Sequence, residues 1–233
     1  MITLEIDGKR VQAEVGQTIL EAAQAAGIRI PTLCHLPGLS PRGSCRICLV
    51  EVTNWNGKLV PACATQVQEG MRVVTSSERL KWLRRMVLEL LFAERNHICA
   101  ICVSNGHCEL QDLACELGMD VVRFPYRFPD LKVDASHAKY VYDPNRCVLC
   151  GRCVRACSEV EGAMTWGFSG RGVYTLVEAD LGGPWGDSET CTECGKCVQA
   201  CPTGALVERG KATAEQEKRP QLLVEVTERR PRV

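Results

Sequence analysis

The chain has 233 residues, enough for one or two domains of usual size, and its 28 basic residues equal its 28 acidic ones. The balance argues against nucleic acid as a partner, and the charged start, MITLEIDGKR, lacks the apolar core of a signal peptide. Only 5% of residues are aromatic whereas 16 are cysteine, so we expect a cytoplasmic protein whose cysteines bind metal. The apolar stretch 86–93 is interrupted by Glu89 and is too short to span a membrane.

Residues 1–78 begin with the pattern of a β-hairpin and a helix. Apolar residues alternate over 2–6 and again over 11–15, on either side of an Asp-Gly turn. Thr18 and Glu21 form a capping box that predicts a helix ending at Gly27. A hairpin followed by a helix is how a ubiquitin-like β-grasp domain begins. We expect the four cysteines of this region to be metal ligands: Cys34, Cys45, Cys48 and Cys63.

The segment 79–119 is expected to be helical and to carry a second group of ligands. Thr75 and Glu78 form another capping box, and apolar residues at helical spacing predict a helix that includes 80–91. Three ligand candidates follow it: Cys99, Cys102 and Cys108. Imidazole replaces thiolate on iron in some clusters, so His97 and His107 are candidates for a fourth ligand. A helix over 109–117 would then carry Cys115, which fits no ligand spacing and is expected to be a small buried hydrophobe.

Residues 124–129 read as an extended connector because prolines interrupt them. The following region, 138–210, contains C-x2-C-x2-C-x3-C twice, at 147–157 and 191–201. In two-cluster ferredoxins the last cysteine of each run binds the other 4Fe-4S cluster. The repeat therefore predicts two crossed groups of ligands: Cys147, Cys150, Cys153 and Cys201 for one cluster, and Cys157, Cys191, Cys194 and Cys197 for the other.

Other interpretations of these cysteines account for less of the pattern. Zinc also binds C-x2-C pairs, but a third and a fourth cysteine in each run exceed what one tetrahedral zinc uses. Disulfides are typical of secreted proteins. Between the two runs, 165–186 predicts a hairpin insertion with a strand at 173–177. The tail, 211–233, leaves two alternatives, a strand over 222–226 and a disordered terminus.

The order of these groups resembles a known family. The phrase PTLCHLPGLSPRGSCRICLVEV is similar to the 2Fe-2S domain at the start of the large iron-sulfur subunit of complex I and of iron-only hydrogenases. With a His-Cys segment and a double 4Fe-4S module after it, and with CELQDLA following Ile101 after six residues, the chain most resembles the small iron-sulfur diaphorase subunit of bidirectional NAD-reducing nickel-iron hydrogenases.

The resemblance implies an α+β chain with one 2Fe-2S cluster and three 4Fe-4S clusters. The 2Fe-2S cluster would be bound by the first four cysteines, in a β-grasp domain. In the related loops a histidine lies four residues before the first cysteine, where this chain has Arg95. Because His97 is closer to that place than His107, we expect His97, Cys99, Cys102 and Cys108 to bind the middle cluster.

The resemblance also implies a function. It indicates a non-catalytic electron-transfer subunit of an oxidoreductase complex, a hetero-oligomer. The chain would relay electrons between a flavin- and NAD-binding diaphorase subunit and the small subunit of a nickel-iron hydrogenase. The alternative is the same relay in an NAD-dependent formate dehydrogenase. The chain has no G-x-G-x-x-G after a strand and no nucleophile-base group, which disfavours an independent enzyme. A zinc-stabilised interaction module is the remaining alternative.

Overall fold

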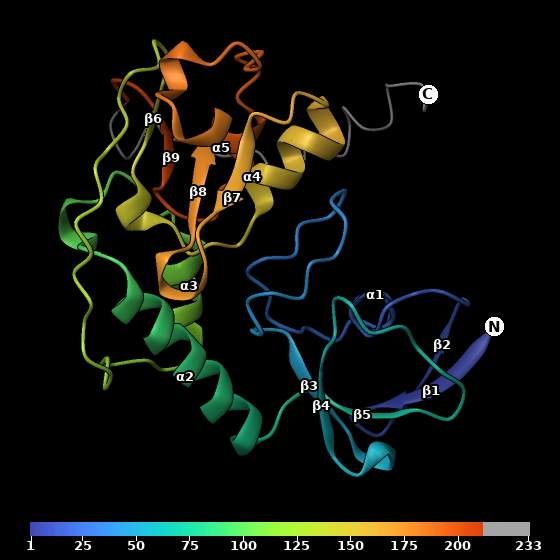
Figure 1. The fold of residues 1–233 in the computed structure, drawn as a ribbon. Coiled ribbons are helices and arrows are strands. Elements are labelled where there is room, and N and C mark those ends of the chain that lie inside the picture. Colours follow the sequence, from blue (N-terminus) through green and yellow to red (C-terminus); the bar gives the residue numbers. More distant parts are fainter. Residues whose placement is uncertain (212–233) are drawn as a thin grey trace. The chain divides into compact units, whose positions relative to one another are not determined.

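The computed structural model describes residues 1–211, which belong to two compact units (Figure 1). The first unit contains Met1–His35, Pro41–Glu89 and Leu113–Val121. The second contains Leu36–Ser40, Leu90–Asp112 and the residues from Val122 onward. Both alternatives for the tail, a strand over 222–226 and a disordered terminus, lie outside the described residues.

The first unit is built on a five-stranded sheet with the order β2-β1-β5-β3-β4. β1 pairs with β5 in parallel, whereas the other neighbours pair antiparallel. This mixed sheet with one helix confirms the predicted β-grasp arrangement. The elements are β1 (Ile2–Ile6), β2 (Lys9–Ala13), α1 (Ile19–Ala25), β3 (Leu49–Val52), β4 (Lys58–Pro61) and β5 (Arg72–Val74).

The first hairpin forms because its turn and its apolar alternation agree. Asp7 and Gly8 have φ values of 49° and 77°, as a two-residue type I′ turn requires. The register places Leu4 opposite Val11, so the apolar side chains of both strands share one face. The core formed by this face and α1 includes Leu4, Ile6, Val11, Ala13, Ile19 and Leu20.

The capping box predicted for α1 is confirmed. The Glu21 amide donates to Thr18 Oγ1 at 3.3 Å, and the Thr18 amide donates to Glu21 Oε2 at 2.7 Å. Gly27 follows the helix with a φ of 71°, a left-handed conformation that ends helices and favours glycine. Both ends of α1 are therefore fixed by local sequence.

Thr18→Ala should weaken α1 locally. The substitution removes the side-chain acceptor for the Glu21 amide and should cost about 1 kcal/mol, so amide hydrogen exchange within α1 should become about fivefold faster. The comparison is Thr3→Ala, in β1, which caps no helix. Equal exchange rates in α1 for Thr18→Ala and the parent chain would contradict the capping role.

The helix α2 (Glu78–Glu94) begins with a different cap from the predicted one. The Leu80 amide donates to Ser77 Oγ at 3.2 Å. Thr75 instead donates its hydroxyl to Asp7 Oδ2 at 2.5 Å, so the capping box predicted at Thr75 is wrong. Thr75 directly follows the last residue of β5, and pairing of that strand holds it beside the hairpin turn.

The second unit surrounds the repeated cysteine motifs with short elements. β6 (Tyr140–Tyr142) pairs antiparallel with β9 (Leu206–Glu208), which joins the beginning and the end of the predicted ferredoxin module. The helices α4 (Arg152–Arg155) and α5 (Lys196–Ala200) each lie within one cysteine run. The two helices therefore occupy equivalent places in the two repeats.

The predicted hairpin insertion is present, with shifted strands. β7 (Trp166–Ser169) pairs antiparallel with β8 (Leu176–Ala179). The strand expected at 173–177 begins only at Leu176, because Gly172–Tyr174 form a 3-10 turn. Further 3-10 turns are Thr53–Trp55, Cys99–Ile101, Pro144–Arg146, Asp180–Gly182 and Trp185–Asp187, and Ala156–Glu161 is a π-helical continuation of α4.

The helix α3 (Glu109–Glu116) lies where the sequence predicts it. Its buried residues are Leu110, Leu113 and Ala114, which recur at helical spacing. Cys115 is exposed, so the expectation that it is buried is wrong. It sits one residue beyond the buried face of the helix. Within residues 1–211, the structure contains no helix that is long and apolar enough to cross a membrane.

Candidate metal centres

The first four candidate ligands lie together in the first unit. Cys34 and Cys45 come from the loop between α1 and β3, Cys48 directly precedes β3, and Cys63 follows β4. The Cys34 amide donates to Cys45 Sγ at 3.4 Å. The side chain of Cys34 also contacts those of Cys45 and Cys63, and Cys48 contacts Cys63. The structure therefore brings all four predicted residues into one group.

The thiols of this group influence one another strongly. Hydrogen bonds from Cys45 and Cys63 hold the pKa of Cys34 well below its usual value. The hydrogen bond to Cys34, together with burial, raises the pKa of Cys45, and contacts with Cys34 and Cys48 raise that of Cys63. Adjacent buried thiolates repel one another, so a positively charged group is required to hold all four deprotonated together. This donor set fits a bound iron-sulfur cluster.

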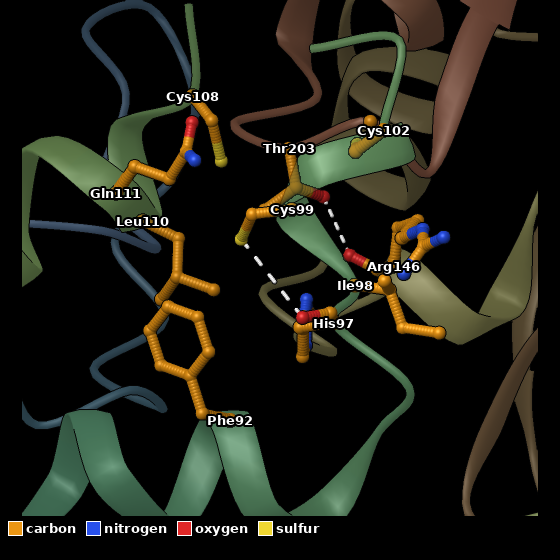
Figure 2. A pocket seen from close by; sticks show the side chains of 11 residues that line it. Phe92, His97, Ile98, Cys99, Cys102, Cys108, Leu110, Gln111, Arg146 and Thr203 are labelled. Atoms are coloured by element: carbon orange, nitrogen blue, oxygen red, sulfur yellow. Dashed lines mark hydrogen bonds between the residues drawn. The ribbon is translucent and has the colours of Figure 1, made fainter. Parts of the chain in front are cut away.

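The middle group of candidate ligands lines a cavity in the second unit (Figure 2). The cavity encloses about 290 Å³ and is lined by His97, Cys99, Cys102 and Cys108 together with apolar residues such as Phe92. Figure 2 shows the sulfur atoms of Cys99 and Cys108 pointing into the same space. Cys99 starts a 3-10 turn after α2, and Cys108 directly precedes α3, so the loop between these helices positions the whole group.

His97 is prepared to bind a metal. Its Nε2 atom is buried and has no hydrogen-bond partner within residues 1–211, and its ring packs edge-on against Phe92 at 5.4 Å between centroids. Burial, reinforced by the positive charges of Arg146 and Arg95, lowers the pKa of His97 to about 4. The imidazole is therefore neutral at physiological pH, the form that ligates metals. His107 is exposed and does not line the cavity.

The repeated cysteine runs line two further cavities of the second unit. One encloses about 320 Å³ and is lined by Cys147, Cys150, Cys153 and Cys201, and the other encloses about 310 Å³ and is lined by Cys157, Cys191, Cys194 and Cys197. Each run thus contributes three sulfurs to one cavity and its last cysteine to the other. Gly151 and Gly195, with φ values of 69° and 71°, allow the tight turn inside each run.

Protonated thiols dominate these cavities in the absence of positive charge. Burial raises the pKa of Cys108 and of Cys147 to about 11, and that of Cys150 to about 12. Cysteine binds metal as the thiolate, so cluster binding must displace these protons. Among residues 1–211, no three or more His, Cys, Asp or Glu side chains are placed to hold a single metal ion. The sulfurs instead surround spaces of about 300 Å³, which suits a multi-iron group.

The three cavities of the second unit adjoin one another. Thr203 lines both the middle cavity and the cavity of Cys147, and its Oγ1 donates to the Arg146 carbonyl at 2.7 Å. Cys201 Sγ donates to the Thr203 carbonyl at 3.3 Å. The other two cavities share one hydrophobic core, which contains Cys153, Cys157, Cys197 and Cys201. The candidate centres therefore form a continuous series.

Some residues of these sites were not predicted. Trp185 donates its indole Nε1–H to Cys191 Sγ at 3.3 Å, and its ring stacks on Tyr140 at 5.4 Å. Arg146 lines the middle cavity although it belongs to the ferredoxin module. Their positions beside Cys191 and Cys147 in the sequence were the available signal. Their orientation depends on tertiary packing, which the spacing of cysteines does not report.

Protein-family comparison divides the chain into three matched regions. Residues 1–78 match a 2Fe-2S iron-sulfur cluster binding domain. Residues 84–123 match the NADH-ubiquinone oxidoreductase-G iron-sulfur binding region, and residues 146–205 match a 4Fe-4S dicluster domain. The matches place all the candidate ligands described above inside iron-sulfur regions.

Comparison with individual proteins finds relatives that carry these regions. The HoxS gamma polypeptide of the NAD-reducing hydrogenase of Cupriavidus necator is 38% identical over 180 residues, covering 77% of this chain and 76% of the relative. An NADH-quinone oxidoreductase polypeptide of Rhizobium meliloti, of the G type, is 40% identical, and the match covers 76% of this chain but 21% of the relative. The putative formate dehydrogenase YrhE of Bacillus subtilis is 37% identical, with 69% and 16% covered.

A solved structure supports the same grouping. A chain in the crystal structure of an NAD+-reducing [NiFe]-hydrogenase in the H2-reduced state matches with a TM-score of 0.85 and 42% identity. The match covers 91% of this chain and 88% of that chain. The similarity therefore extends over both the fold and nearly the full length of the two chains.

Proposed function

The chain belongs to the family of iron-sulfur proteins that includes the HoxS gamma polypeptide of NAD-reducing hydrogenase, and from this membership we propose that it is a cytoplasmic electron-transfer subunit of such a complex. It relays single electrons between a flavin- and NAD-binding diaphorase subunit and the small subunit of a nickel-iron hydrogenase. It has no active site of its own. The observation that carries the proposal is the set of three adjoining cavities of 290–320 Å³, each lined by one predicted group of four ligands.

The proposed cofactors are one 2Fe-2S cluster and three 4Fe-4S clusters. The 2Fe-2S cluster is assigned to the four cysteines in mutual contact in the first unit, Cys34, Cys45, Cys48 and Cys63. The 4Fe-4S clusters are assigned to the three cavities of the second unit, with His97 as the one nitrogen ligand. The unpartnered Nε2 atom of His97 and the exposure of His107 support this choice of histidine.

The residues around the cavities favour electron relay over substrate chemistry. Iron-sulfur clusters, when bound, take up and release one electron at a time. Arg95 is buried and donates to the Thr175 carbonyl at 2.6 Å, and Arg146 lines the middle cavity. Positive charges at these positions favour the reduced, more negative state of the middle centre. Apolar packing around all three cavities excludes water and holds their spacing constant.

Trp185→Phe should lower the midpoint potential of the cluster bound by Cys191. The substitution removes the indole N–H that donates to Cys191 Sγ at 3.3 Å and retains an aromatic ring beside Tyr140. A hydrogen bond to sulfur stabilises the reduced state, so the loss should be roughly 60 mV, or about 1.4 kcal/mol for one electron. Redox titration followed by electron paramagnetic resonance (EPR) measures this shift.

The matched control for that titration is Trp82→Phe. Trp82 is 50% exposed on α2 and lines none of the three cysteine cavities. Its substitution should leave every potential in place. Equal potentials in Trp185→Phe and the parent chain would show that the indole contributes nothing to the electronic properties of this site.

The alternative function is the same relay in an NAD-dependent formate dehydrogenase, and the match to the putative formate dehydrogenase YrhE favours it. The two functions are distinguished with the complex captured anaerobically on this chain as bait. Reduction of NAD+ driven by hydrogen is expected, and none driven by formate. Formate-driven reduction without hydrogen-driven reduction would replace the partner and leave the ligand assignments unchanged.

A further inference from the structure

A cavity in the first unit has no part in the proposed relay. It encloses about 950 Å³, and its lining includes four cationic side chains and one acidic one: Arg29, Lys81, Arg84, Arg85 and Glu116. The hydroxyl-bearing Ser76 also lines it. No candidate cluster ligand does so. The composition of the lining therefore favours an anion.

Arg84 is the unusual member of this lining. Its side chain is 3% exposed, and its Nη2 donates to the Leu49 carbonyl at 2.6 Å and to the Thr75 carbonyl at 2.8 Å. Its Nε atom is buried without a hydrogen-bond partner in the described part of the chain. A buried guanidinium that meets only neutral acceptors retains a large desolvation cost, and that burial lowers the pKa of Arg84.

The neighbouring charges do not neutralise Arg84. Glu116 pairs with Arg29 at 2.5 Å. Arg85 donates its Nε–H to the Leu117 carbonyl at 3.0 Å, and no carboxylate of residues 1–211 forms an ion pair with Arg84 or Arg85. Lys81 pairs with Glu78, whose side chain is almost fully exposed. Within the described residues, two guanidinium groups in one cavity thus lack an acidic partner.

We propose that this cavity binds a phosphate group, either as inorganic phosphate or as part of a small phosphorylated molecule, through Arg84 and Arg85. A guanidinium presents paired N–H donors in a planar fork that matches two oxygens of a phosphate. The anion supplies the charge that Arg84 lacks and accepts from its unpaired Nε–H. The size of the cavity leaves room for more than the phosphate itself.

Phosphate binding should also affect the nearest candidate cluster. Arg84 donates to the carbonyl of Leu49, the residue after Cys48, and its charge acts on Cys48 directly. An anion bound at Arg84 offsets that positive charge, so the reduced state of the cluster becomes less favourable and its potential falls. This consequence rests on the proposed 2Fe-2S cluster, whereas phosphate binding itself does not.

The test measures binding of radiolabelled inorganic phosphate to the anaerobically purified full chain by equilibrium dialysis, with ADP in a parallel series. Arg85→Gln should weaken binding at least about tenfold because it removes a charged donor. The matched control is Arg79→Gln, on the same helix, since Arg79 pairs with Glu51 at 3.6 Å and lies outside the cavity. Arg85 is half-buried, so its substitution is less disruptive than that of Arg84.

Each outcome decides the proposal. Binding that Arg85→Gln weakens and Arg79→Gln does not supports it, and binding of ADP alone with the same dependence identifies the phosphate of a larger molecule. No binding of either probe, or equal loss in both variants, overturns it. In an EPR-monitored titration, phosphate should lower the 2Fe-2S potential in the parent chain and not in Arg85→Gln. A chain without a 2Fe-2S signal contradicts the proposed function, and dialysis still tests the phosphate site.

Discussion

Cys201→Ala is expected to remove the same cluster as Cys150→Ala, although the two residues are 51 positions apart. Both sulfurs line one cavity, whereas Cys194 lines another. Each of the first two variants should lose about four irons per chain and one and the same EPR signal, and Cys194→Ala should lose a different one. Hydrogen-driven reduction of NAD+ should collapse in all three because the series of centres is interrupted.

The control for these variants is Cys115→Ala, because Cys115 is exposed and lines none of the three cavities. It should retain the full iron content and all signals. If Cys201→Ala instead removes the signal that Cys194→Ala removes, the last cysteine of each run serves its own cluster. The crossed assignment would then be wrong.

His97→Cys is expected to retain the middle cluster and to lower its midpoint potential. A thiolate adds negative charge where the neutral imidazole stood, and replacement of nitrogen by sulfur ligands lowers iron-sulfur potentials by an amount on the order of 100 mV. The shift should be confined to one EPR signal, because the other cavities contain no histidine in their lining. Redox titration of the parent and variant chains measures it.

His107→Cys provides the comparison for that experiment. His107 is exposed and does not line the middle cavity, so its substitution should leave the potential unchanged. A shift in His107→Cys together with an unchanged His97→Cys would assign the fourth ligand to His107. It would also require the loop before α3 to adopt a different conformation.

The sequence was most informative where structure is decided locally. The turn Asp7-Gly8 and the capping box at Thr18 depend on residues within a few positions, and both are confirmed. The repeated cysteine runs are similarly informative, because fixed short spacings place sulfurs on one side of a turn. The two groups of four that they predict line two separate cavities.

Features decided by distant contacts were not predictable in this way. Thr75 has the sequence of a helix cap, but its hydroxyl is taken by Asp7, 68 residues away. Cys115 has an apolar side chain, but the helix turns it away from Leu110, Leu113 and Ala114. The burial of Arg84 likewise depends on the carbonyl of Leu49, on another element. Such contacts leave no periodic signal in the sequence.

The most direct test of the electron-relay account is the content of iron, acid-labile sulfide and zinc in the anaerobically purified full chain. One 2Fe-2S cluster and three 4Fe-4S clusters predict about 14 irons and as many sulfides per chain, without stoichiometric zinc. About four zinc ions per chain and no labile sulfide would contradict the account, and would identify the cysteine groups as structural zinc sites of an interaction module.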